Sequence, residues 1–120
     1  MKTFFVAFFL ALSLTVSAHA ANVRDSISMD YESVPAGTAN QALGPTGAAG
    51  DILDQLIVTV NTTAQSAVYL NDGTGTSVWV TRGSTPIGVY SLTYGMRSQI
   101  GAWKITTDNG VSVMAVGRFR

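Results

Sequence analysis

Residues 102–118, AWKITTDNGVSVMAVGR, are the stretch that decides the fold class. Its two apolar runs, Ala102–Thr107 and Val111–Arg118, alternate with polar or small residues at the period of a half-buried strand. Asp108, Asn109 and Gly110 separate them, and these residue types tolerate the positive φ angles of a tight turn. The stretch therefore predicts two antiparallel strands joined as a hairpin.

The same pattern of short apolar runs separated by turn residues extends back to residue 51. Short apolar runs recur at intervals of roughly 8 to 12 residues, the spacing typical of a sandwich or barrel. Asn71-Asp72-Gly73 predicts a second hairpin by the same turn chemistry. Residues 51–57 also fit the stripe of a short helix, but a strand is preferred because Val58–Val60 continues it without a break. The further predicted strands are Leu53–Val60, Ala67–Leu70, Ser77–Thr81 and Ile87–Tyr94.

Residues 21–50 differ from the rest of the chain. They are rich in Gly and Pro and lack a sustained period of 2 or 3.6, apart from Ile27, Met29 and Tyr31. We expect one short strand followed by an arm or loop over residues 21–50, and a β-sandwich domain over residues 51–120. The predicted fold is a single all-β domain, an antiparallel β-sandwich or jelly-roll-like fold of about six to seven strands with an N-terminal arm.

Residues 1–20 have the three parts of a secretory signal peptide. Lys2 gives a positive start, Phe4–Val16 is almost uninterrupted apolar sequence, and Ala18-His19-Ala20 places small residues before a cleavage site at Ala21. The apolar run is shorter than the roughly 20 residues that span a bilayer as a helix, so we expect export and no stable membrane span. The alternative is an apolar leader that is retained and docks on a partner.

Composition excludes several classes of function. The chain has no cysteine, its one histidine is His19 within the leader, and seven Lys and Arg balance seven Asp and Glu. A mature chain without Cys and His has no disulfide, no thiolate or imidazole zinc site and no Ser-His-Asp triad. The lack of net positive charge argues against a nucleic-acid partner. We therefore predict a protein that is not an enzyme, with no catalytic residue, cofactor or metal site.

The acidic residues are consistent with this prediction. On a strand, Asp51 and Asp54 lie three residues apart and on opposite faces, so we interpret them as solvated surface carboxylates. Asp72 and Asp108 fall in the two turns, where a side chain bonded to its own backbone accounts for them. Calcium at either turn is the alternative, although each turn supplies only one nearby acid.

The aromatic residues divide into buried and exposed sets. Strand alternation places Trp103 and Ile105 on one face, which predicts that Trp103 is in the core. Three residues of the run 87–94 also share a face at the core or its rim: Tyr90, Leu92 and Tyr94.

Trp79 alternates with Ser77 and Thr81 and is the best candidate for an exposed aromatic residue. Tyr69, beside Asn71, is also predicted to point outward. The pair could bury against a neighbouring subunit, or it could stack on a sugar ring.

Several segments of the C-terminal half together resemble a group of small tailed-phage proteins, over roughly residues 44–119. The resemblance implies a β-rich, virion-associated structural component, such as a head-decoration or tail accessory subunit, and it brings no catalytic motif. The segments that carry it are 44–51 (GPTGAAGD), 69–73 (YLNDG), 95–98 (GMRS), 101–107 (GAWKITT) and 111–117 (VSVMAVG).

The predicted function is accordingly structural. We expect a homo-oligomer, for example a trimer, that contacts other virion or cell-surface proteins through the 21–50 arm and the Trp79 face. The expected location is the virion or, after export, the extracellular space. The alternative is a secreted carbohydrate- or surface-binding module in which Trp79 and Tyr69 form a stacking platform for a glycan.

Overall fold

Eight strands and one short 3-10 helix follow one another in residues 29–120, the part of the chain that the computed structural model describes. The predicted signal peptide, residues 1–20, lies outside the described residues. The elements are β1 (Asp30–Val34), β2 (Gln41–Ala42), β3 (Ile52–Val60), η1 (Thr63–Gln65), β4 (Val68–Asp72), β5 (Val78–Thr81), β6 (Gly88–Arg97), β7 (Trp103–Thr107) and β8 (Val111–Arg118).

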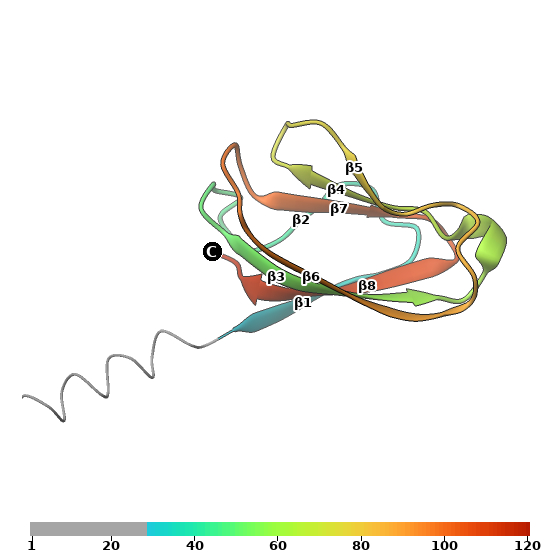
Figure 1. Cartoon of the computed structure of the whole chain (residues 1–120). Helices are drawn as coiled ribbons and strands as arrows, with labels where there is room; N and C mark the ends of the chain where they lie inside the picture. Colours follow the sequence, from blue (N-terminus) through green and yellow to red (C-terminus); the bar gives the residue numbers. More distant parts are fainter. Residues whose placement is uncertain (1–28) are drawn as a thin grey trace, which may run out of the picture.

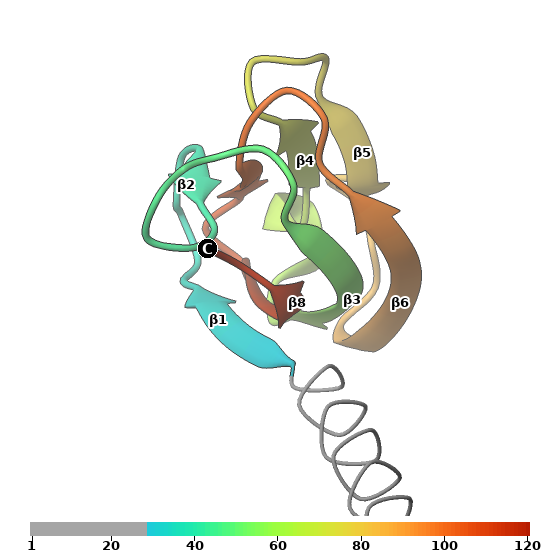
Figure 2. The same cartoon turned by 90° about the vertical axis from the view of Figure 1, so that its left-hand side faces the viewer.

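The strands form two antiparallel sheets of four strands each. Sheet A has the order β1-β8-β3-β6, and sheet B has the order β2-β7-β4-β5. The two sheets face each other in a sandwich-like arrangement (Figure 1). Seen from the end, the edge strands β1 and β2 lie on one side of the domain, and the edge strands β5 and β6 lie on the other (Figure 2).

The core lies between the sheets and is built by strand alternation. In β3, every second residue from Leu56 to Val60 is fully buried, and β7 buries Trp103 and Ile105 in the same way. The prediction that Trp103 is a core residue is confirmed, and Tyr90, Leu92 and Tyr94 pack against the core from β6, at its rim. The buried core residues are Val34, Leu43, Leu53, Leu56, Val58, Val60, Val68, Leu70, Trp103, Ile105, Val111, Val113, Ala115 and Phe119.

The strands predicted beyond residue 50 are all present within a few residues of the expected bounds. Residues 52–60 form a strand, so the helical alternative for residues 51–57 is not adopted. A register shift between Leu53 and Gln55 marks a β-bulge in this strand. No helix in the described part of the chain is long and apolar enough to cross a bilayer.

One of the two predicted hairpins is wrong. β4 and β5 pair with each other around Asp72 and Gly73, as expected. In contrast, residues 108–110 lead from β7 in sheet B to β8 in sheet A, and these two strands do not pair. Both strands have one apolar face, and the chain buries both faces by setting Ile105 and Val113 in one core from opposite sheets.

The segment expected to be an arm contributes to both sheets. β1 pairs with β8 along its whole length, and β2 pairs with β7. Val34 and Leu43 are fully buried in the core, and the Glu32 carboxylate accepts a hydrogen bond from the Gly44 N–H at 2.8 Å. Residues 30–43 therefore belong to the same two-sheet domain. They raise the strand count to eight, because β2 is too short to show a period in the sequence.

Candidate interaction surface

The outer face of sheet A consists of side chains that its four strands turn away from the core. Register places them in rows across the sheet, for example Ser33 beside Met114, Met114 beside Ile57, and Ile57 beside Ser91. The central rows of this face consist of Tyr31, Ser33, Gln55, Ile57, Thr59, Val89, Ser91, Thr93, Ser112, Met114 and Val116. The row at one end, formed by Arg97, Ile52 and Arg118, continues the same alternation.

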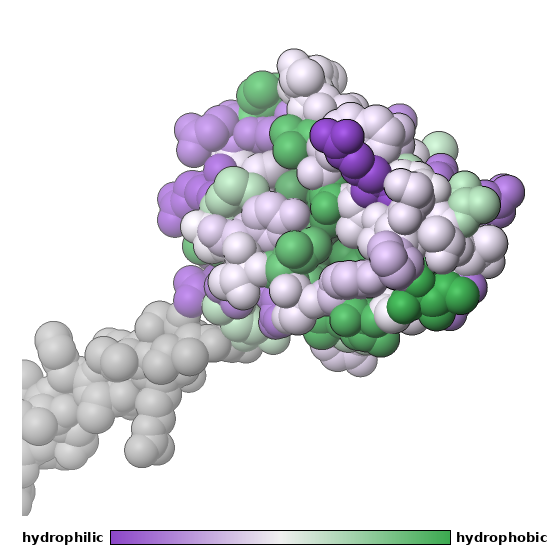
Figure 3. Space-filling view, turned by 45° about the vertical axis from the view of Figure 1, so that its right-hand side comes forward, coloured by the Kyte–Doolittle hydropathy of each residue, from purple (hydrophilic) through white to green (hydrophobic). Residues whose placement is uncertain are grey.

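None of the side chains in the central rows is charged, and several large apolar ones are exposed, whereas Arg97 and Arg118 place charge at one end of the face. Tyr31 has 73% of its surface exposed, and Val89 and Met114 are also exposed. Hydrophobic side chains gather along the lower edge of the domain in Figure 3, the side on which sheet A lies in Figure 1. Protein interfaces are depleted of charge at their centres and enriched in Tyr and Met, so this face has the composition of a contact surface.

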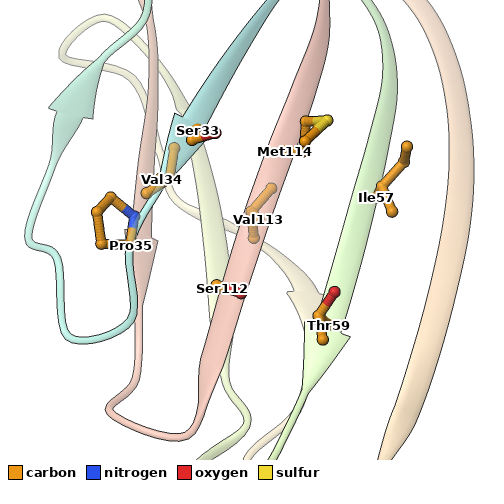
Figure 4. A pocket seen from close by; sticks show the side chains of 8 residues that line it. All are labelled: Ser33, Val34, Pro35, Ile57, Thr59, Ser112, Val113 and Met114. Atoms are coloured by element: carbon orange, nitrogen blue, oxygen red, sulfur yellow. The ribbon is translucent and has the colours of Figure 1, made fainter.

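A hollow of about 210 Å³ indents the same face between β1, β8 and β3. Figure 4 shows Met114 on the central strand, with Ser33 on one side and Ile57 on the other. Within the described residues, the hydroxyls of Ser33, Thr59 and Ser112 have no hydrogen-bond partner. A partner can therefore fill the hollow with an apolar group and bond these hydroxyls at its wall. The lining residues are Ser33, Val34, Pro35, Ile57, Thr59, Ser112, Val113 and Met114.

Tyr69 and Trp79 lie together on the outer face of sheet B. The two residues are cross-strand neighbours on β4 and β5, and their ring centroids are 4.3 Å apart at an interplanar angle of 44°. Trp79 is 53% exposed, whereas Tyr69 is half-buried. Sequence alternation selected both residues, and the sheet brings them into direct contact.

Asp51 is not the surface carboxylate that its spacing from Asp54 predicts. Only 2% of its surface is exposed. Its Oδ1 accepts a hydrogen bond from the Arg120 N–H at 2.9 Å, and its backbone oxygen accepts one from Trp103 Nε1 at 3.1 Å. Oδ2 has no partner in the described part of the chain. The Oδ1 hydrogen bond links the residue before β3 to Arg120, which follows β8.

The two turn aspartates bond to distant segments rather than to their own backbone. Asp72 accepts hydrogen bonds from three successive backbone N–H groups, those of Gln99, Ile100 and Gly101, at 2.7 to 3.2 Å. Asp108 Oδ2 accepts one from the Ala67 N–H at 3.0 Å. No cluster of three or more His, Cys, Asp or Glu side chains that could hold a metal ion is found in residues 29–120.

The pKa of Asp72 lies below its ordinary value of 3.8. Partial burial acts to raise this pKa, but the three backbone hydrogen bonds favour the ionised carboxylate and outweigh it. The ionised side chain thus holds the loop between β6 and β7 against the turn between β4 and β5.

The sequence alone did not identify the outer face of sheet A. Alternation within each strand shows which residues share a face. Predicting which of these residues lie side by side also requires the strand order, in which β8 lies between β1 and β3. That order depends on contacts between segments that are distant in sequence. No protein-family model matches this sequence, and no curated protein matches it.

Proposed function

We propose that this protein is a non-enzymatic structural subunit that acts through protein contacts of the outer face of sheet A. The observation that carries the proposal is the uncharged centre of this face, with exposed Tyr31, Val89 and Met114 around the hollow beside Ser112. An isolated domain exposes such a face to water at a free-energy cost, and a partner that covers it removes the cost.

The strand order supports a further proposal, that the domain is an eight-stranded jelly roll. The strands pair in a nested order, β1 with β8, β2 with β7, β3 with β6 and β4 with β5, as a long hairpin rolled into two sheets would pair. Double-sheet jelly rolls of eight strands recur in viral capsid and lectin domains. Together with the resemblance to tailed-phage proteins, this order favours a virion setting, as a head-decoration or tail accessory subunit.

The proposed subunit is a homo-oligomer, for example a trimer, bound to other virion proteins. Its compartment depends on residues 1–20. A cleaved leader leads to an exported protein that starts at Ala21, and a retained leader is an additional apolar contact with a partner.

The experiment is the native mass of the protein purified from its natural source, with and without particles. We expect subunits in a stable oligomer or in the particle fraction. Met114→Asp places a carboxylate in the centre of the face and should release monomers, because burying an unpaired charge is costly. Thr74→Asp, on the exposed loop between β4 and β5, is the matched control and should assemble normally.

A monomeric protein that remains outside the particle fraction would contradict the proposal. Equal assembly of Met114→Asp and Thr74→Asp would contradict it as well, because the face would then make no contact that a charge disrupts. The mass of the subunit also reports whether the chain starts at Met1 or at Ala21.

The contact between Tyr69 and Trp79 favours a second candidate function, a secreted module that binds carbohydrate or a cell surface. An exposed indole packed at a tilt on a second ring is a fixed apolar platform on which a sugar ring can stack. Glycan titration should then change Trp fluorescence in the monomer and lose this change in Trp79→Phe with Trp103 intact. Unchanged binding in Trp79→Ala would reject this function.

A further inference from the structure

A second opening lies between the two sheets, and its lining residues come from β4, β5, β6 and β7 and from the loop after β4. On this side of the domain, β5 and β6 are the edge strands (Figure 2). It is a cleft of about 340 Å³, within the range of about 300 to 1,000 Å³ that small-molecule sites occupy. Both sheets contribute walls, with apolar side chains in the majority. The lining residues are Leu70, Asp72, Thr76, Val78, Tyr94, Met96 and Trp103.

The part of the wall that Asp72 and Thr76 form is held by the neighbouring loop between β6 and β7 before any ligand arrives. The Asp72 carboxylate binds three consecutive N–H groups of residues 99–101, and the Gly73 N–H donates to the Ala102 carbonyl at 2.9 Å. The two loops touch so closely that a Cβ at Gly73 would lie 2.7 Å from the Gly101 nitrogen. A preformed wall lowers the ordering cost of binding.

Apolar side chains that line the cleft are exposed to solvent, so an apolar ligand would gain by covering them. Val78 is 60% exposed, and Met96 is also exposed, although both line an apolar space. Tyr94 is half-buried in the same wall, and its hydroxyl bonds to no other residue in the described range 29–120. Burial raises the pKa of Tyr94, so this hydroxyl stays protonated and can donate one hydrogen bond.

We propose that this cleft binds a small, largely apolar molecule with one oxygen that accepts a hydrogen bond from the Tyr94 hydroxyl. At about 30 Å³ for each water displaced, the volume corresponds to a ligand of about ten non-hydrogen atoms. The inference is independent of the proposed contact surface, because the outer face of sheet A shares no residue with the cleft.

The probe is 1-heptanol, a flexible apolar chain with one hydroxyl. The chain has two tryptophans, so Trp79→Phe leaves Trp103 in the cleft wall as the single fluorescent reporter. We expect a saturable change in Trp103 emission and matching shifts of the Met96 methyl signal in NMR spectra. Met114→Asp should bind the probe as well as the parent, which separates this test from the test of the contact surface.

Two substitutions in this background locate the binding. Val78→Phe fills the mouth of the cleft and should weaken 1-heptanol binding at least tenfold, whereas Tyr94→Phe removes only the hydroxyl and should weaken it about threefold. Ile87→Phe is the matched control, because Ile87 is similarly exposed but lies outside the cleft, and it should leave binding unchanged.

A non-saturating response, or equal binding by Val78→Phe and the parent, would overturn the proposal, since either result means unspecific partitioning. A third result would also overturn it: an oligomer that excludes 1-heptanol and dissociates with Val78→Phe would show that a second copy of the chain covers the cleft.

Discussion

The turn at Asn71-Asp72-Gly73 and the turn at Asp108-Asn109-Gly110 contain the same three residue types in a different order, but they have different structures. Gly73 has a φ of 54°, in the left-handed region, and the chain returns as β5 beside β4 in the same sheet. In the second turn, Asn109 and Gly110 do not adopt positive φ, and the chain crosses from sheet B to sheet A. Turn composition therefore locates a reversal of the chain but does not tell whether the next strand joins the same sheet.

The two turns lie at opposite ends of sheet B, and in each the aspartate is the link to a distant segment. Asp72 is opposite Trp103 in the β4–β7 register, whereas Val68, at the other end of β4, is opposite Thr107. The first turn is tied to the loop that enters β7, and the second is tied to the residue before β4. The two turns differ in the number of backbone hydrogen bonds that their aspartates accept, three in the first turn and one in the second. They also differ in the core residues that lie beside them.

The largest expected effect is at Trp103, opposite Asp72 at the end of sheet B where the first turn lies. Trp103→Ala should lower the free energy of unfolding by about 3 to 5 kcal/mol, because it leaves a cavity in the core and removes the hydrogen bond to the Asp51 carbonyl. Urea unfolding measures the loss. Trp79→Ala is the control and should cost about 1 kcal/mol, since Trp79 is exposed and loses only its packing on Tyr69. A loss below about 1 kcal/mol for Trp103→Ala would mean that β7 is shifted by one residue.

The next effect compares the two aspartates directly. Asp72→Asn should cost about 1 to 2 kcal/mol and Asp108→Asn about 1 kcal/mol or less, because the first carboxylate accepts three backbone hydrogen bonds and the second accepts one. Thermal and urea unfolding of both variants give the comparison. Equal losses of unfolding free energy would show that the number of backbone hydrogen bonds to the aspartate does not distinguish the two turns.

Acid should weaken the three hydrogen bonds that Asp72 accepts in the first turn, because these bonds favour the ionised carboxylate. The pKa of Asp72 is lower in the folded chain than in the unfolded one, so the unfolded state binds more protons in acid. The stabilisation is complete above the ordinary pKa of 3.8 and is lost as the pH falls through the folded pKa. The stability difference between the parent and Asp72→Asn, measured from about pH 7 to about pH 2, should therefore shrink in acid. A difference that stays constant or grows would contradict this mechanism.

The smallest effect is expected in the second turn. Asn109 is exposed and its φ is not positive, so Asn109→Ala should change the free energy of unfolding by no more than about 0.5 kcal/mol. If residues 108–110 formed the hairpin turn that their composition predicts, with Asn109 in the left-handed region, the same substitution would cost about 1 kcal/mol or more. Chemical denaturation separates the two cases.

The candidate surfaces could be predicted only in part. Alternation along single strands predicted an exposed Trp79 and an outward Tyr69, and both lie where expected. The outer face of sheet A and the cleft beside Val78 could not be predicted, because their residues come from strands or loops that are distant in sequence. The burial of Asp51 could not be predicted for a related reason, because its contact with Arg120 brings together residues 69 positions apart in the chain.

The sequence by itself determined the all-β class, most strand positions and the residues that share a face, because side-chain period and turn chemistry act over a few residues. Only the tertiary structure decided which strands became neighbours. It set β8 between β1 and β3, placed strands from residues 30–43 in both sheets and led residues 108–110 from one sheet to the other. These choices depend on burying every apolar face at once, and that condition involves the whole chain.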